Sequence, residues 1–318
     1  MQAMAGGVRE IVRQTIHVFF KHYHMFASIA GLFVFPASAS LLISHAILPS
    51  SSQFLNTIQY RFRSLFLAAG FPVTTDFFSL VGLKLSQTIF TFFFTLPFTL
   101  TLLLVAKASV MSIVCRLQWE QCHSFSLRVY GCLFKTTLCN SMLILTANAA
   151  VFSFLFVVFN TADVFFGSSS TVILILSALG AIVYSIILAH VIVICNLSLV
   201  VSAVDNKGGF FPFIKSFFLV RSRPSTALFL AIPANLGMAA VEGLFQYRVI
   251  KQYYYNNHAA NTSLMLESIS IIYIHSLLVV LDVIASCLFF NTCTAGIRDE
   301  QEEASSAASV NQKLQQLV

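Results

Sequence analysis

The chain has 318 residues, of which 58% are hydrophobic and only 9% are charged. Soluble globular domains carry about 25% charged residues, and a fold of this length hides only about 75% of the surface of its unfolded chain. Together with 33 Phe and a mean hydropathy of +0.85, this composition excludes a soluble enzyme, a disordered chain and a collagen-like fibre. The formal net charge of +6 comes from basic residues scattered between apolar runs. It therefore indicates membrane orientation and not nucleic-acid binding.

Six stretches of the chain are long and apolar enough to cross a bilayer, whose hydrocarbon core of about 30 Å requires about 20 residues of helix. They are residues 25–48, 87–114, 139–159, 172–201, 225–245 and 269–294. We therefore expect an all-α, polytopic membrane helical bundle of about six transmembrane helices, with additional interfacial amphipathic helices. Residues 1–24 are expected to form a cytosolic segment with an interfacial helix, residues 25–296 the transmembrane domain, and the polar residues 297–318 a disordered cytosolic tail.

Prolines interrupt three of these predicted spans. Pro36, Pro97 and Pro233 fall inside the first, second and fifth spans. Each lacks an N–H and frees the carbonyl four residues earlier, so each predicts a kink. A kink can serve as a hinge or a cavity wall, or it can follow from helix packing alone, since proline is common in membrane helices.

The distribution of Lys and Arg between the predicted loops indicates the orientation of the bundle. Of the 18 basic residues, twelve lie on the side of the two termini, five lie on the opposite side, and Lys107 falls within the second span. Cytosolic loops carry the excess of Lys and Arg, so both termini are expected in the cytosol. The Asn261-Thr262-Ser263 sequon then lies on the non-cytosolic side, which makes Asn261 a candidate glycosylation site.

Aromatic and basic residues alternate in the segments expected at the cytosolic surface. Residues 8–23 place apolar and basic side chains on different faces of a helix, the pattern of an interfacial helix. Residues 209–223 carry five Phe among their basic residues. The candidates for contact with anionic lipid, which attracts each basic residue by about 1 kcal/mol, are Arg9, Arg13, Lys215, Arg221 and Arg223. The alternative is that these segments are short helices packed under the bundle.

Ionisable residues within a span cost about 2.5–3.5 kcal/mol to insert, so they are candidates for function. The candidate intramembrane polar site comprises Asp282, His275, His190, Asn196 and Lys107, with Asn148, Asn235 and Glu242 as further members of an inward-facing polar seam.

Two interpretations of this polar site stay open. In one, Asp282 and either His190 or His275 form a protonatable pair that lines a path for a solute or a proton. In the other, each polar group hydrogen-bonds to a neighbouring helix and holds the bundle together. Lys107 either pairs with Asp282 or extends towards the cytosolic interface.

Catalytic and metal-binding signatures are missing from the sequence. There is no HExxH, GxSxG, P-loop or GxGxxG motif, and the seven Cys include no CxxC pair. We therefore expect neither enzymatic activity, nor a bound metal, nor a cofactor.

Two short segments carry a resemblance to a known family. The run from Asn196 to Asp205 ends a span in small, Val and Ser residues, and Gly208-Gly209-Phe210 and Ile214-Lys215-Ser216 follow it. It resembles a plant family of six-span hydrophobic transmembrane proteins of unknown function. Lys107-Ala108-Ser109-Val110, followed by Ser124-Phe125-Ser126, is similar to the corresponding element of the first half. A looser similarity extends to the membrane domain of some glycerophosphodiester phosphodiesterases.

These observations lead to two functional hypotheses. The first is a non-enzymatic integral protein of a plant endomembrane, such as the endoplasmic reticulum, or of the plasma membrane. It would act through helix packing, lipid contact or assembly with itself or other membrane proteins. The second is a transporter or channel for a small solute or a proton, using Asp282 with His190 or His275.

Overall fold

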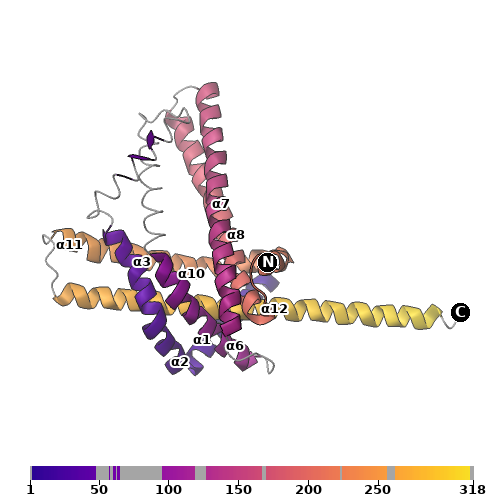
Figure 1. Cartoon of the computed structure of the whole chain (residues 1–318). Coiled ribbons are helices and arrows are strands. Elements are labelled where there is room, and N and C mark those ends of the chain that lie inside the picture. Colours follow the sequence, from indigo (N-terminus) through magenta and orange to yellow (C-terminus); the bar gives the residue numbers. More distant parts are fainter. Residues whose placement is uncertain are drawn as a thin grey trace. The chain divides into compact units, whose positions relative to one another are not determined.

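The computed structural model describes residues 2–47, 57, 60, 61, 63, 64, 95–118, 127–166, 170–222, 224–255 and 262–315 (Figure 1). Its α-helices are α1 (Gln2–Lys21), α2 (Tyr23–Ile29), α3 (Phe35–Ile47), α6 (Leu104–Gln118), α7 (Leu127–Phe166), α8 (Ser170–Asp205), α9 (Phe211–Ser222), α10 (Pro224–Phe245), α11 (Lys251–Tyr255) and α12 (Thr262–Gln315). Three π-helical segments are η1 (Ala30–Val34), η2 (Thr99–Leu103) and η3 (Gln246–Ile250). The described residues contain no strand, which confirms the all-α prediction.

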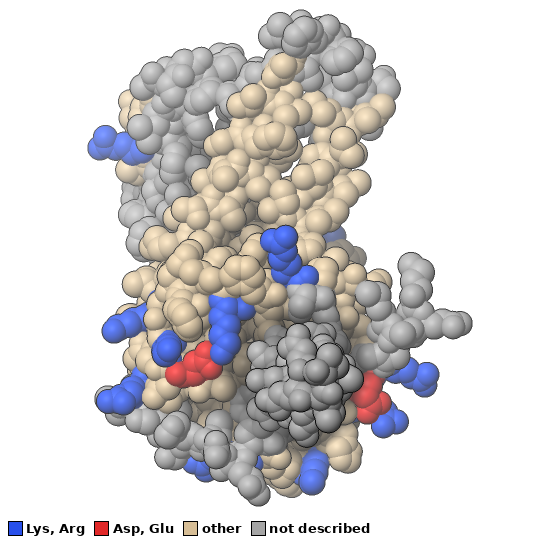
Figure 2. Space-filling model, turned by 90° about the vertical axis from the view of Figure 1, so that its right-hand side faces the viewer, with Lys and Arg blue, Asp and Glu red and all other residues tan. Residues whose placement is uncertain are grey.

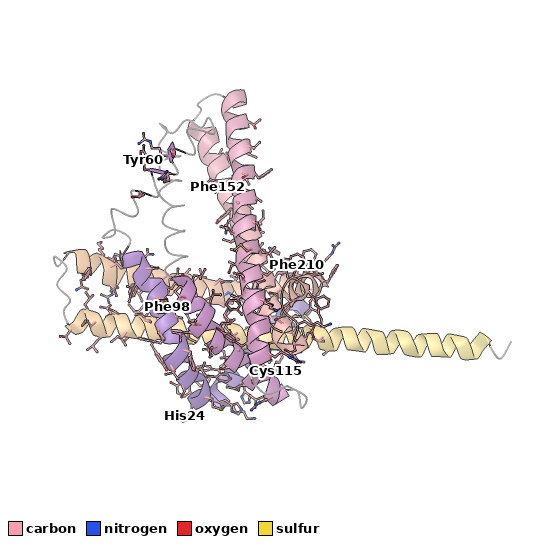
Figure 3. All side chains as sticks on the ribbon, viewed as in Figure 1. His24, Tyr60, Phe98, Cys115, Phe152 and Phe210 are labelled. Carbon is pink, nitrogen blue, oxygen red and sulfur yellow. The ribbon has the colours of Figure 1, made fainter. Side chains whose placement is uncertain are left out.

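Six helical spans are long and apolar enough to cross a membrane, as predicted. They are Tyr23–Ser44, Thr95–Leu117, Arg128–Leu155, Ala178–Asp205, Pro224–Tyr253 and Thr262–Gly296. These spans expose many large apolar side chains, including Phe152 on α7 (Figure 3). Figure 2 shows a face of the molecule on which uncharged side chains cover more of the described surface than Lys and Arg do. Exposed apolar surface of this extent is what a membrane-embedded chain requires.

The chain divides into two compact units. Unit 1 comprises Met1–Lys21, Ala108–Pro233 and Leu281–Val318, and unit 2 comprises His22–Lys107 and Ala234–Val280. In unit 1 the core is built on α7, α8 and α9, which contact one another. In unit 2 the buried core is formed by Leu42 of α3, Phe245 of α10, and Ile271 and Ile272 of α12.

Helices α7 and α8 of unit 1 lie side by side (Figure 1) and are joined by a ladder of polar contacts. The first three α7 members recur every fourth residue, so they lie along one ridge of the helix. The ladder comprises Cys132 with Asn206, Thr136 with Ser202 at 2.9 Å, Asn140 with Ser198 at 2.8 Å, and Asn148 with Tyr184 at 2.7 Å. Hydrogen bonds between small polar residues are a main means by which membrane helices associate.

The turn between α8 and α9 is fixed against α7 at the end of this ladder. The Gly209 N–H donates to Thr136 Oγ1 at 3.2 Å, and Ser202 Oγ donates to the Lys207 carbonyl at 2.9 Å. Gly209 has a φ of 97°, a left-handed conformation that favours glycine. A Cβ added to Gly208 would lie 2.7 Å from the carbonyl oxygen of Cys132, so only glycine permits this approach of the turn to α7.

Two of the three predicted kinks coincide with π-helical segments in unit 2. Segment η1 ends two residues before Pro36, and η2 begins two residues after Pro97. A π-turn contains one extra residue and changes the direction of the side chains that follow it. Pro233 lies inside α10.

The two ends of the chain are both helical in the structure. On α1, Ile11, Thr15 and Phe19 are buried, but Ile16 is 48% exposed, so the buried apolar face is narrower than the sequence indicated. Residues 297–315 continue helix α12. The Ala, Glu and Gln residues of this segment are strong helix formers.

The substitution Gly208→Ala tests the fixed turn. We expect it to lower stability by about 1–3 kcal/mol, because the added methyl group overlaps backbone atoms of Cys132 that cannot move independently. Thermal unfolding of the detergent-solubilised protein measures the effect. Gly131→Ala, where an added Cβ meets nothing within 4 Å, is the matched control and should leave the midpoint unchanged or raise it. Equal midpoints for the two variants would contradict the close approach.

Candidate functional site

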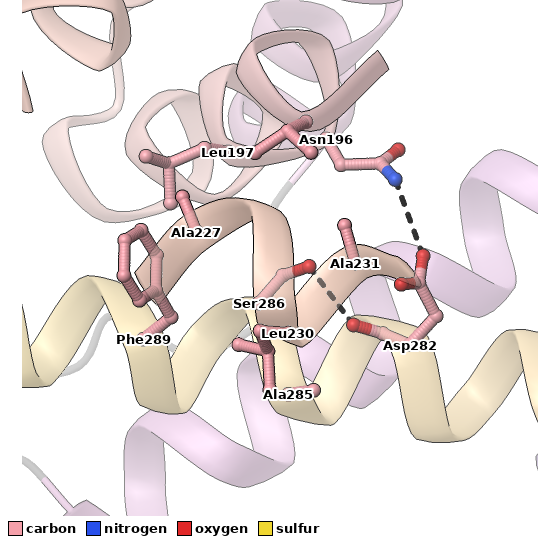
Figure 4. Close-up of a pocket in the computed structure, with 10 residues that line it drawn as sticks. Asn196, Leu197, Ala227, Leu230, Ala231, Asp282, Ala285, Ser286 and Phe289 are labelled. Carbon is pink, nitrogen blue, oxygen red and sulfur yellow. Dashed lines mark hydrogen bonds between the residues drawn. The ribbon is translucent and has the colours of Figure 1, made fainter. Parts of the chain in front are cut away.

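The most central acidic residue of the predicted spans, Asp282, lines a small cavity in unit 1 (Figure 4). Three helices form this cavity: α8 and α12 supply its polar side chains, and α10 supplies apolar wall. Its lining residues are Val193, Asn196 and Leu197 from α8, Ala227, Leu230 and Ala231 from α10, and Asp282, Ala285, Ser286 and Phe289 from α12.

Two hydrogen bonds organise the polar end of the cavity. Asn196 Nδ2 donates to Asp282 Oδ2 at 3.2 Å, joining α8 to α12. Ser286 Oγ donates to the backbone carbonyl of Asp282 at 2.9 Å, within α12. Both are drawn in Figure 4. An amide N–H cannot accept a hydrogen bond, so Asn196 offers Asp282 a fixed donor at membrane depth.

The space itself arises from small side chains. Ala227, Ala231 and Ala285 leave a cavity of about 30 Å³ between the three helices. This is room for about one water molecule, and the carboxylate, amide and hydroxyl groups can hydrogen-bond to it. The arrangement can therefore hold a water or exchange a proton, while its remaining wall is apolar.

The structure brings Asn196 and Asp282 together. The imidazole Nδ1 of His190 lies 2.9 Å from the backbone carbonyl of Ile186 on its own helix. Lys107 lies half-buried on α6, in the other unit. The rotation of α8 thus directs Asn196 towards Asp282 on α12, while the described bond of His190 stays within α8.

His275 belongs to a second polar cluster, in unit 2. Its Nδ1 lies 3.0 Å from Ser38 Oγ on α3, and its Nε2 lies 3.8 Å from Glu242 Oε1 on α10. The imidazole is 3% exposed and Ser38 is 4% exposed. Within unit 2, the partners of His275 are therefore Ser38 and Glu242. Ser38 gave no signal in the sequence, because serine is frequent in membrane helices and usually bonds to its own helix.

The candidate lipid-contact residues lie on exposed helix faces. Arg9 and Arg13 are exposed on α1, where Arg13 forms an ion pair with Glu10 at 3.2 Å. On α9, Arg221 is exposed and Lys215 Nζ lies 2.6 Å from Asp205 Oδ2. Arg223 and the candidate glycosylation site Asn261 lie outside the described residues. Within the described residues, no group of three or more His, Cys, Asp or Glu side chains is arranged to hold a metal ion.

Comparison with known proteins gives one match. A family model described as a domain of unknown function (DUF8558) matches residues 1–307. The chain belongs to this family. No curated protein and no solved structure matches the chain. Membership of DUF8558 thus agrees with the resemblance to a family of unknown function, and it adds no activity.

The hydrogen bond between Asn196 and Asp282 can be tested by a double-mutant cycle. Asn196→Leu should destabilise the protein by about 1–3 kcal/mol, because it withdraws a hydrogen-bond donor from a partly buried carboxylate. In an Asp282→Leu background the same change should cost much less, since no carboxylate remains to be satisfied. Reversible unfolding in mixed micelles measures both. Thr146→Val, which affects a hydroxyl bonded only to its own helix, should be near neutral, and additive effects in the cycle would refute the coupling.

Proposed function

We propose that the protein is a non-enzymatic, multi-pass integral membrane protein that acts at the cytosolic leaflet through contact with anionic lipids, helix packing and partner assembly. The observation that carries this proposal is helix α9. It exposes aromatic and basic side chains together, and the turn before it is fixed to α7.

The two faces of α9 differ in the way that an interfacial helix requires. Pro212, Ser216, Leu219 and Val220 are buried. The large apolar side chains Phe210, Phe211, Ile214, Phe217 and Phe218, at and along the helix, are 42–62% exposed; Figure 3 shows Phe210. Exposed Phe beside Lys and Arg is typical of a helix that lies in the headgroup region.

The basic side chains of this face differ in the partners that they already have within the protein. Lys207 Nζ lies 4.9 Å from the centre of the Phe211 ring, while Lys215 is neutralised in part by Asp205. Arg221 is exposed near the other end of the helix. Lys207 and Arg221 are therefore the side chains that we expect to attract lipid phosphates most strongly, at about 1 kcal/mol each.

The location rests on the sequence. The excess of Lys and Arg on one side of the six spans supports cytosolic termini and a position of α9 at the cytosolic surface. The resemblance to a plant family of six-span proteins supports a plant endomembrane, such as the endoplasmic reticulum, or the plasma membrane. Assembly with another membrane protein, or with a second copy, would use the exposed apolar helix faces.

A lipid-binding measurement tests the role of α9. We expect the purified protein to retain phosphatidylserine in preference to phosphatidylcholine, as measured by native mass spectrometry. The double variant Lys207→Glu/Arg221→Glu should reduce this preference roughly tenfold or more, because two attractions become repulsions. Lys251→Glu is a matched control, since Lys251 also lies 4.9 Å from an aromatic ring, that of Tyr247, but is predicted on the opposite side of the membrane. Equal retention of both lipids by the wild type would reject the proposal.

A second candidate function is transport of a small solute or a proton, and the cavity at Asp282 favours it. If Asp282 carries the transported species or its coupling proton, Asp282→Asn in proteoliposomes should abolish pH-dependent flux, because the amide cannot release a proton. Glu267→Gln, at the ion pair with Arg248, removes a carboxylate from the same helix and should leave the flux unchanged. Flux that keeps its rate and pH dependence in the Asp282 variant would remove this role.

A further inference from the structure

We infer that His275, Glu242 and Ser38 form a proton-binding site between helices α3, α10 and α12 of unit 2. The pair of His275 and Glu242 is the element that gains and loses the proton, and Ser38 orients the imidazole. This site is distinct from the lipid-contact face and does not depend on the proposed function.

The geometry assigns a polar neighbour to each ring nitrogen of His275. Nδ1 is within hydrogen-bond distance of Ser38 Oγ, at 3.0 Å. Nε2 faces Glu242 Oε1 at 3.8 Å, a separation that is close enough for charge attraction but longer than a hydrogen bond. A proton on Nε2 would therefore draw the two side chains together, or a water would bridge them.

Because His275 is buried, a change in the charge of this pair should strongly affect the packing of the helices around it. The side chain of His275 is 4% exposed and that of Glu242 is 37% exposed. The imidazole is therefore buried, while its partner Glu242 is partly accessible from outside the protein. With a neutral imidazole and an ionised carboxylate the pair carries one negative charge, and the uptake of one proton cancels it, whichever atom holds that proton. Three helices therefore meet at a point whose net charge changes by one unit.

Both partners of His275 lie next to π-helical segments. Ser38 follows the end of η1, at Val34, by four residues, and Glu242 precedes the start of η3, at Gln246, by four residues. A π-turn shifts the register of a helix by one residue and is frequent at functional sites. Pro36, between η1 and Ser38, withholds a backbone hydrogen bond. Each of the two helices that supply a partner of His275 thus borders a π-helical segment about one turn from that partner.

Some of the other titratable or charged groups described in unit 2 have partners of their own. Tyr273 is hydrogen-bonded to Tyr23, and Arg248 pairs with Glu267 at 3.1 Å. The remainder are His22, His24, Tyr60, Arg61, Arg63, Lys107, Tyr247, Lys251 and Tyr253. Across α3, α10 and α12, Glu242 is the charged group that the structure places against the ring of His275.

The test follows the imidazole directly in the full-length protein. Ring-¹⁵N labelling of histidine in nanodiscs reports the neutral and charged forms, and the His275 signals are identified by their loss in His275→Gln. We expect the ring signals of His275 to differ between about pH 8 and about pH 5 as the pair takes up its proton. Glu242→Gln, which removes the neighbouring carboxylate, should change this pH dependence. A wild-type signal that stays unchanged across this range would overturn the inference.

Matched variants separate the proposed site from general effects on the fold. Glu267→Gln removes a carboxylate that pairs with Arg248 in the same unit, so the His275 signals should not change. If Glu242→Gln does not fold, Glu242→Asp keeps the charge and shortens the side chain, and the His275 signals should stay closer to those of the wild type. Ser38→Ala should alter the Nδ1 signal, whereas Ser44→Ala, whose hydroxyl bonds to its own helix, should not. Identical His275 titrations in the Glu242 and Glu267 variants would also overturn the inference.

Discussion

Polar side chains at membrane depth must find their hydrogen-bond partners inside the protein, because the hydrocarbon core contains no water to satisfy them. In unit 1 this constraint fixes how α8 is rotated against α7. Asn140 Nδ2 donates both to Ser198 Oγ and to the carbonyl of Cys195, at 2.8 and 2.9 Å. Since successive residues of a helix are rotated by roughly 100°, Asn196 then points away from α7. It reaches Asp282 on α12, so the ladder determines the partner of the most central acidic residue.

The same ladder links the interior of unit 1 to its predicted membrane surface. Thr136 bonds to Ser202 and also accepts the N–H of Gly209, which begins the return of the chain towards α9. The close approach at Gly208 leaves the turn little freedom. Because α9 starts directly after this turn, the direction in which its Phe side chains are exposed depends on hydrogen bonds made within the bundle.

The six spans could be predicted because bilayer thickness imposes both their length and their apolar composition. Their ends could not be predicted as well. Helix α7 begins at Leu127, twelve residues before the predicted span, because Thr136 and other polar residues of its first turns lower the hydropathy while packing against α8. The residues of the candidate site were found individually, but not all of their pairings. Hydropathy does not encode the rotation of one helix against another, and this rotation selects Asn196 over His190 as the partner of Asp282.

The two polar clusters differ in what a change of protonation would do to each. Asp282 receives a hydrogen bond from an amide, a group that cannot titrate, and the neighbouring wall is mainly alanine and other apolar residues. That contact suits a fixed junction between α8 and α12. His275 instead faces a second titratable group, at a distance that a proton can shorten, and its partners lie one helical turn from π-helical segments. A helix can shift its register more easily at a π-turn than within a regular α-helix. Unit 2 therefore combines a group whose charge can change with backbone that can respond to it, and the Asp282 cluster is not built in this way.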